Sequence, residues 1–80
     1  MLQPHQERVI VEAGDLDEKL LKLRDFTGTE VFKYKLPFDE QQRLLRQMAY
    51  MSGYSAVLHE RIRCFDNGAD HPALPAAADD

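Results

Sequence analysis

The stretch VIVEAGDLDEKLLKLRDFT, residues 9–27, contains a stripe of apolar side chains at alternating steps of four and three residues. The positions of this stripe are occupied by Val9, Ala13, Leu16, Leu20, Leu23 and, as its polar last member, Thr27. Such spacing marks the a and d positions of a coiled coil, where one narrow stripe of a helix packs against a partner helix. The stretch therefore predicts a helix over about residues 5–27 that packs against a second helix.

The same steps return in LLRQMAYMSGYSAVLHERIRCF, residues 44–65. The stripe here consists of Leu44, Met48, Met51, Ser55, Leu58, Ile62 and Phe65. In an antiparallel pair, residues that face each other have numbers with a constant sum, and six successive pairs, from Val9 with Ile62 to Thr27 with Leu44, share the sum 71. The sequence thus predicts an all-α fold, an antiparallel two-helix coiled-coil hairpin whose second helix covers about residues 39–65.

The connection over residues 28–38 gives a weaker signal. Gly28 is expected to end the first helix. Apolar and polar residues then alternate weakly, which indicates an ordered or partly extended connection and leaves strand, short helix and loop open. Asp39 is expected to cap the second helix, with the Gln42 side chain reaching back as in a capping box.

The chain divides into a helical hairpin domain, residues 1–68, and a tail, residues 69–80. The tail consists mainly of Pro, Ala and Asp, with Leu74 as its one large aliphatic residue. Segments of this composition bury too little apolar surface to offset the entropy of ordering them. We therefore expect a disordered C-terminal tail.

A chain of 80 residues buries a small share of its surface, so its stability usually needs a disulfide, a metal or a partner chain. Cys64 is the only cysteine, which excludes an intrachain disulfide and favours a reducing compartment. The three histidines and this cysteine match no zinc-binding spacing, so neither a metal nor a cofactor is expected. The remaining possibility is a homo-oligomer.

The net charge of −4 arises at one end of the chain. The last fifteen residues hold four aspartates and no lysine or arginine, whereas residues 1–65 contain ten acidic and ten basic residues. This balance disfavours DNA and RNA as partners. No apolar run of the roughly 18 residues that a membrane span needs and no signal-peptide pattern is present, so a cytoplasmic protein is expected.

Aromatic and basic residues outside the two stripes are candidates for ligand binding. One line on the second helix, at steps of four and three, consists of Tyr50, Tyr54, Val57, Arg61 and Cys64. Exposed apolar lines usually mark interfaces, and aromatic rings beside cationic groups can stack on bases and hold phosphates. The candidate ligand-binding residues are Lys19, Lys22, Tyr50, Tyr54 and Arg61, with help from Arg43 and Arg46. The alternatives are an ordinary solvated face and an interface with another protein.

Catalytic patterns are missing from the sequence. It contains no Gly-rich phosphate loop, no plausible Ser/His/Asp set and no His-Glu-x-x-His motif. Asp17 and Glu18 are interpreted as ordinary helix surface rather than as an acid–base pair. We therefore expect no catalytic residues and a protein that binds something rather than transforms it.

Residues 4–28 and 36–65 resemble a group of short helical-hairpin proteins of tailed phages and prophages, with relatives in crAss-like phages. The shared elements include H-Q-x-R-V from His5, E-x-x-x-L-D-x-K-L-x-K-L from Glu12 and M-x-x-Y-x-x-x-L-x-x-R-I-x-x-F from Met51. The predicted architecture is also similar to that of phage sponges directed against the CBASS and Thoeris defence systems. That similarity implies an oligomer that sequesters a cyclic-nucleotide or related immune messenger.

These observations lead to three hypotheses. The first is a phage counter-defence protein in the cytoplasm of the bacterial host, which binds and sequesters a nucleotide-type messenger as a homo-oligomer. The second is a protein–protein adaptor or inhibitor that docks on a host or phage protein through the exposed aromatic and apolar face of the second helix. The third, a nucleic-acid-associated regulator, is disfavoured by the charge balance.

Overall fold

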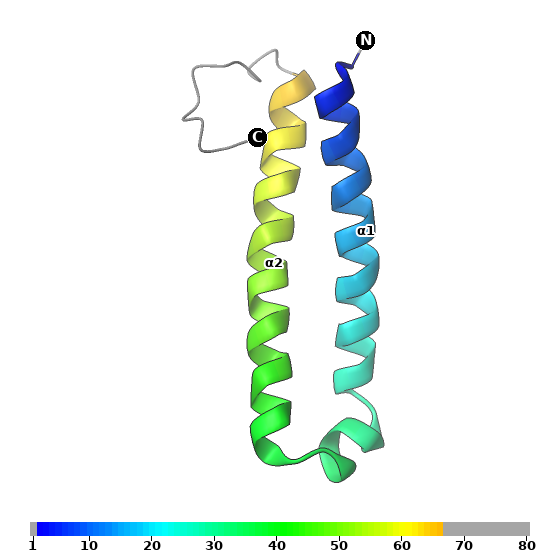
Figure 1. The fold of residues 1–80 in the computed structure, drawn as a ribbon, viewed down its shortest axis with the longest axis vertical. Coiled ribbons are helices and arrows are strands. Elements are labelled where there is room, and N and C mark those ends of the chain that lie inside the picture. Colours follow the sequence, from blue (N-terminus) through cyan, green and yellow to red (C-terminus); the bar gives the residue numbers. More distant parts are fainter. Residues whose placement is uncertain (1, 67–80) are drawn as a thin grey trace.

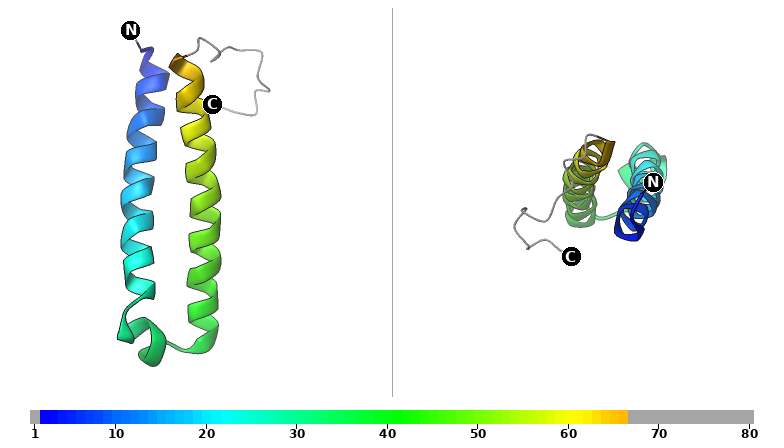
Figure 2. Two further views of the ribbon diagram at one scale, coloured as in Figure 1. Left: turned by 180° about the vertical axis from the view of Figure 1, so that it is seen from behind. Right: turned by 90° about the horizontal axis from the view of Figure 1, so that it is seen from above.

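The computed structural model describes residues 2–66, which form a hairpin of two long helices (Figure 1). Helix α1 spans Pro4–Thr27, a short π-helix η1 spans Val31–Lys35, and helix α2 spans Phe38–Asp66. The views in Figure 2 show that α1 and α2 run antiparallel and stay side by side along their length. The all-α hairpin and both helix ranges are thereby confirmed to within one residue. The prediction for residues 69–80 lies outside the described residues.

Helix α1 begins with Pro4 in its first turn, where a residue without an N–H leaves no helical hydrogen bond unmade. The Gln3 N–H donates to the Gln6 side-chain Oε1 at 2.7 Å, a capping contact close to the open end of the hairpin. At the other end, the Gly28 N–H donates to the Asp25 carbonyl at 3.1 Å. Gly28 therefore ends the helix as predicted, but with φ −89° rather than in the left-handed conformation of many helix ends.

Residues 31–35 of the connection are helical, so a short helix is the one that forms among the three conformations left open by the sequence. The Leu36 N–H donates to the Val31 carbonyl at 3.2 Å, the hydrogen bond of a π-helical turn. Phe32 is buried and packs edge-on against Phe26, with ring centroids 5.8 Å apart. The π-helical turn places the Phe32 side chain against the end of α1. The weak alternation of apolar and polar residues in this segment did not predict the contact.

The start of α2 also differs from the prediction. The helix begins at Phe38, and the Gln41 N–H donates to the Pro37 carbonyl at 3.0 Å, so that Asp39 lies inside the first turn. The Asp39 carboxylate accepts a bond from the adjacent Glu40 N–H, and no capping box forms with Gln42 within the described residues. Instead the Gln41 side chain reaches back and donates to the Leu36 carbonyl at 3.0 Å.

The core is the predicted seam between the helices. Every stripe position of both helices is buried or half-buried. Val9, Ala13 and Leu58 form the most buried cluster, and Leu16, Ile62 and Phe65 pack against it. This cluster unites Ala13 with Leu58 and Val9 with Ile62, as the common sum of 71 requires.

The seam leaves much of the apolar surface uncovered. Among the described residues, five hydrophobic side chains are buried, whereas eleven large ones are exposed, including Ile10, Leu21 and Tyr50. A hairpin of 48 × 23 × 17 Å is too thin to cover them itself. Within residues 2–66, neither helix combines the length and the apolar character needed to cross a bilayer.

Candidate functional site

The seam divides the surface of the hairpin into two faces. On one face, Asp17 reaches across to α2 and binds His59. On the other, Lys19 and Tyr54 line a common groove. Residues two positions apart on a helix point about 200° apart, so Asp17 and Lys19 necessarily lie on opposite sides of the seam. We call these the Asp17 face and the groove face.

The first groove of the groove face, the α1 groove, is open and has a volume of about 740 Å³. It is lined by Pro4, Glu7, Arg8, Val11, Glu12, Asp15, Leu16, Lys19 and Tyr54. The lining therefore contains three carboxylates and two cationic groups. The predicted approach of Lys19 to Tyr54 is present, but the acidic surplus makes this groove a poor site for a phosphate.

The second groove, the α2 groove, has a volume of about 560 Å³ and a different character. Its lining consists of Arg43, Arg46, Gln47, Tyr50, Met51 and Tyr54, with no carboxylate among them. Tyr54 belongs to both grooves and so connects them. Two arginines, two phenol rings and an amide are groups that bind phosphate oxygens and stack on planar bases.

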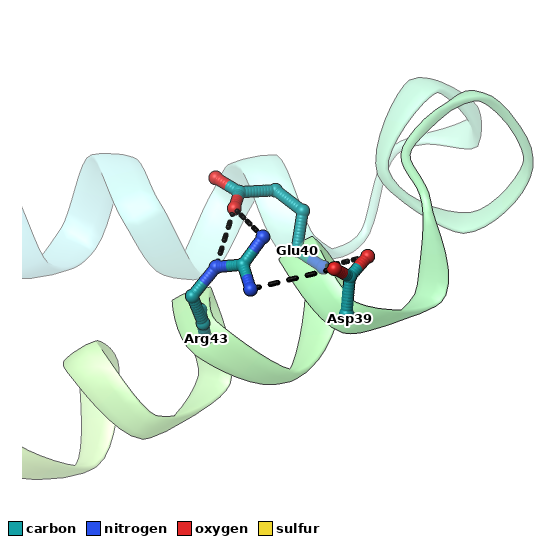
Figure 3. A network of polar contacts seen from close by, with 3 residues as sticks. All are labelled: Asp39, Glu40 and Arg43. Atoms are coloured by element: carbon teal, nitrogen blue, oxygen red, sulfur yellow. Dashed lines mark hydrogen bonds and ion pairs between the residues drawn. The ribbon is translucent and has the colours of Figure 1, made fainter.

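The two arginines of the α2 groove differ in how they are held. Arg43 donates through Nε to Glu40 Oε1 at 2.9 Å, and its Nη1 lies 3.4 Å from Asp39 Oδ2 (Figure 3). The hydrogen bond to Glu40 raises the pKa of Arg43 above its ordinary value and fixes the guanidinium over the first turn of α2. Arg46 makes no ion pair or side-chain hydrogen bond within residues 2–66, so it is the arginine with free donors.

The structure places five of the seven candidate residues in the linings of the two grooves. Lys19 and Tyr54 line the α1 groove, and Tyr54 joins Tyr50, Arg43 and Arg46 in the α2 groove. The other two, Lys22 and Arg61, are not part of either lining. Lys22 is exposed and pairs with Glu18 at 3.5 Å.

A cross-helix cluster on the Asp17 face was missed from the sequence. The Ser55 hydroxyl donates to Asp17 Oδ1 at 2.5 Å, and His59 Nε2 lies 2.6 Å from Asp17 Oδ2. The bond from Ser55, followed by that from His59, lowers the pKa of Asp17 below its ordinary value of 3.8. Asp17 is therefore a link between the helices, and its interpretation as ordinary surface was wrong. The available signal was Ser55, a polar residue in the seam opposite Leu16.

The same cluster does not have the geometry of a nucleophilic site. Serine and histidine each bind a separate oxygen of the carboxylate, so His59 is not placed to accept the Ser55 proton. Across residues 2–66, no three metal-ligating side chains gather in one place. The cluster fastens the helices together, and the groups suited to a ligand lie on the other face.

The sequence model of one protein family, Sequestin, matches residues 3–64, which include nearly all of both helices. The chain belongs to the Sequestin family. The name of the family suggests a sequestering function. The match covers both grooves of the groove face and the Asp17 cluster. Neither the curated proteins nor the solved structures contain a match to this Sequestin chain.

Proposed function

We propose that this Sequestin is a phage counter-defence protein. In this proposal it binds a nucleotide-type immune messenger in the cytoplasm of the bacterial host and holds it unchanged, as a homo-oligomer. The observation that carries the proposal is the α2 groove, where Arg46, Tyr50 and Tyr54 gather without a carboxylate in the lining. The sequestering function suggested by the family name supports it.

The chemistry of the α2 groove fits a ligand with phosphate and base. A guanidinium binds phosphate oxygens through paired hydrogen bonds, each worth about 1.5 to 3 kcal/mol when charge-assisted. Stacking of a base on an aromatic ring adds about 1 to 3 kcal/mol. Arg43 already shares its charge with Asp39 and Glu40, so Arg46 is expected to carry the larger part of phosphate binding.

The test is a depletion experiment. The protein is incubated with a panel of cyclic di- and trinucleotides and nucleotide-sugar messengers, the free ligand is measured, and the bound ligand is recovered by denaturation. A sequestering protein depletes at least one messenger in stoichiometric amount and releases it chemically intact. Release of a converted product would instead establish an enzyme and overturn the proposal.

Substitutions in the α2 groove test whether the messenger binds there. Arg46→Ala and Tyr50→Ala should each weaken binding about tenfold or more, because each removes one kind of contact. Arg63→Ala is the matched control, since Arg63 is an exposed arginine of α2 that lines neither groove. Equal affinity of Arg46→Ala and wild type would remove the α2 groove from the proposal.

A second candidate function is a protein–protein adaptor or inhibitor that docks on a host or phage protein through α2. It is favoured by the exposure of Tyr50 (70%) and Val57 (51%), which is high for large apolar side chains. Val57 lines neither groove, so Val57→Glu separates the two functions. The variant should abolish docking of a partner protein and leave messenger affinity unchanged. Failure of the wild type to bind any messenger would move this candidate ahead.

A further inference from the structure

The Asp17 face presents two aligned stripes, one from each helix. On α1, steps of four and three place Ile10, Gly14 and Leu21 in line with Asp17. On α2, the same steps place a second stripe in line with His59, namely Leu45, Ala49, Ser52 and Ala56. Because Asp17 binds His59 across the seam, both stripes lie on one face of the hairpin.

This face presents exposed apolar side chains around the Asp17 cluster. Ile10 (39%), Leu21 (54%) and Leu45 (37%) are exposed, and small side chains lie between them on α2. The polar groups in its middle already satisfy one another, since the Asp17 carboxylate accepts bonds from α2 through both oxygens. A neighbouring molecule could therefore cover the middle of the face without leaving the Asp17 carboxylate unpaired.

No contact within the chain requires a glycine at position 14. A Cβ at this position would meet nothing within 4 Å, and the residue lies within regular helix. Glycine in a helix interior destabilises it relative to alanine. A glycine between Ile10 and Leu21 is explained by the close approach of a backbone from outside the chain. Gly53 is equally open, but it lies in line with Tyr50 and Val57 on the outer side of α2.

A second copy of the chain fits this face best. Ile10 and Leu21 are eleven residues apart, about three helical turns, and Gly14 lies between them. If α1 crosses α1 of a two-fold-related copy in antiparallel direction, Ile10 of each copy meets Leu21 of the other. The face spans about 48 by 23 Å, enough for the roughly 800 Å² per partner that a stable interface buries.

We propose that two copies of this chain pack through their Asp17 faces, with the α1 helices crossing near Gly14 and the grooves of both copies pointing outward. The inference rests on the homo-oligomer of the proposed function and assigns its interface. The ligand groove is then formed within one chain, so assembly and messenger binding use separate surfaces. This separation makes the two proposals independently testable.

The test measures molar mass in solution by light scattering at micromolar chain concentration. Wild type should show twice the 9.2 kDa of one chain. Ile10→Glu and Leu21→Lys should each raise the dissociation constant at least about tenfold, because each places an unpaired charge in the interface. An equimolar mixture of these two variants should recover the dimer, since Ile10→Glu of one chain then faces Leu21→Lys of the other. Helicity by circular dichroism shows that the variants still fold.

Two pairs of variants supply the controls. Val11 neighbours Ile10 and is more exposed (61%), but it lines the α1 groove, so Val11→Glu should leave the mass unchanged. Gly14→Ala should weaken the dimer although it favours the helix, whereas Gly53→Ala should favour the helix and leave the mass unchanged.

Two results would overturn the proposed interface. One is a wild-type molar mass of 9.2 kDa at every concentration, and the other is a dimer that persists in both Ile10→Glu and Leu21→Lys. Recovery of the mass in the mixture is specific to the antiparallel crossing, so its absence would overturn the crossing of α1 on α1. If the dimer behaves as expected and no messenger binds, the interface stands and the proposed function falls. If Ile10→Glu is monomeric and still binds messenger, both stand.

Discussion

The two ends of the hairpin are held together in different ways. At the open end, near the start of α1 and the end of α2, Val9, Ala13 and Leu58 are almost fully buried in the seam. At the turn end, Met48 and Leu44 are only half-buried, and the buried group is Phe32, which comes from the turn itself. The open end therefore depends on the heptad spacing of both helices, whereas the turn end depends on contacts that one short segment makes with the helices beside it.

The largest expected effect concerns the open end. Leu58 is 1% exposed and lies in the centre of the core cluster, so Leu58→Ala should lower the free energy of unfolding by about 2 to 5 kcal/mol. Met48→Ala is the matched change near the turn end, where a half-buried side chain loses less, about 1 to 2 kcal/mol. Urea unfolding at one fixed chain concentration measures both. Equal losses would contradict the difference between the two ends.

The seam could be predicted from the sequence because two independent stripes agree on one register. Each stripe is a local pattern, and the constant sum of paired numbers links them without any knowledge of the turn. The turn could not be predicted, because its π-helical form depends on the packing of Phe32 against Phe26 and on the Gln41 side chain. A short segment with weak alternation is compatible with several backbones until those contacts are known.

The candidate site was predicted in part for the same reason. Helical spacing brings Tyr50 and Tyr54 together, and the register adds Lys19 across the seam. The acidic lining of the α1 groove, formed by Glu7, Glu12 and Asp15, was not predicted. Asp17 was missed because it lies on the flank of the seam rather than in the stripe, and its partners Ser55 and His59 lie on the other helix.

The second prediction concerns Asp17, which fastens the middle of the hairpin between its two ends. Its pKa is lowered in the folded state by the bonds from Ser55 and His59. Its ionised form therefore stabilises the fold above the ordinary value of 3.8, and this contribution is lost as the pH falls through 3.8 toward the lowered folded-state pKa. Asp17→Asn removes the contribution at every pH.

The measurement is the free energy of unfolding of wild type and Asp17→Asn from neutral pH to well below 3.8. Wild type should be the more stable protein at neutral pH, and the difference should shrink as the carboxylate of the wild type is protonated. Asp25→Asn is the control, because Asp25 is an exposed aspartate of the same helix that has no bond to α2 within residues 2–66. A difference that stays constant with pH would show that the bonds to Ser55 and His59 do not favour the ionised carboxylate.

The smallest expected effect lies at the turn end, where Gln41 and Gln42 are adjacent and have the same side chain. The Gln41 Nε2 group donates to the Leu36 carbonyl at 3.0 Å and ties the exit of η1 to α2, whereas Gln42 is exposed. Alanine is slightly the better helix former, so both substitutions gain the same small propensity term. Their difference therefore isolates the hydrogen bond, and Gln41→Ala should be less stable than Gln42→Ala by about 0.5 to 1 kcal/mol.

Hydrogen exchange of the Phe32 and Leu36 amides should accelerate in Gln41→Ala alone, because the loosened contact belongs to the turn. The reverse order of stabilities would mean that Gln42 caps α2 in solution, and the turn would then be closed by the capping box expected from the sequence.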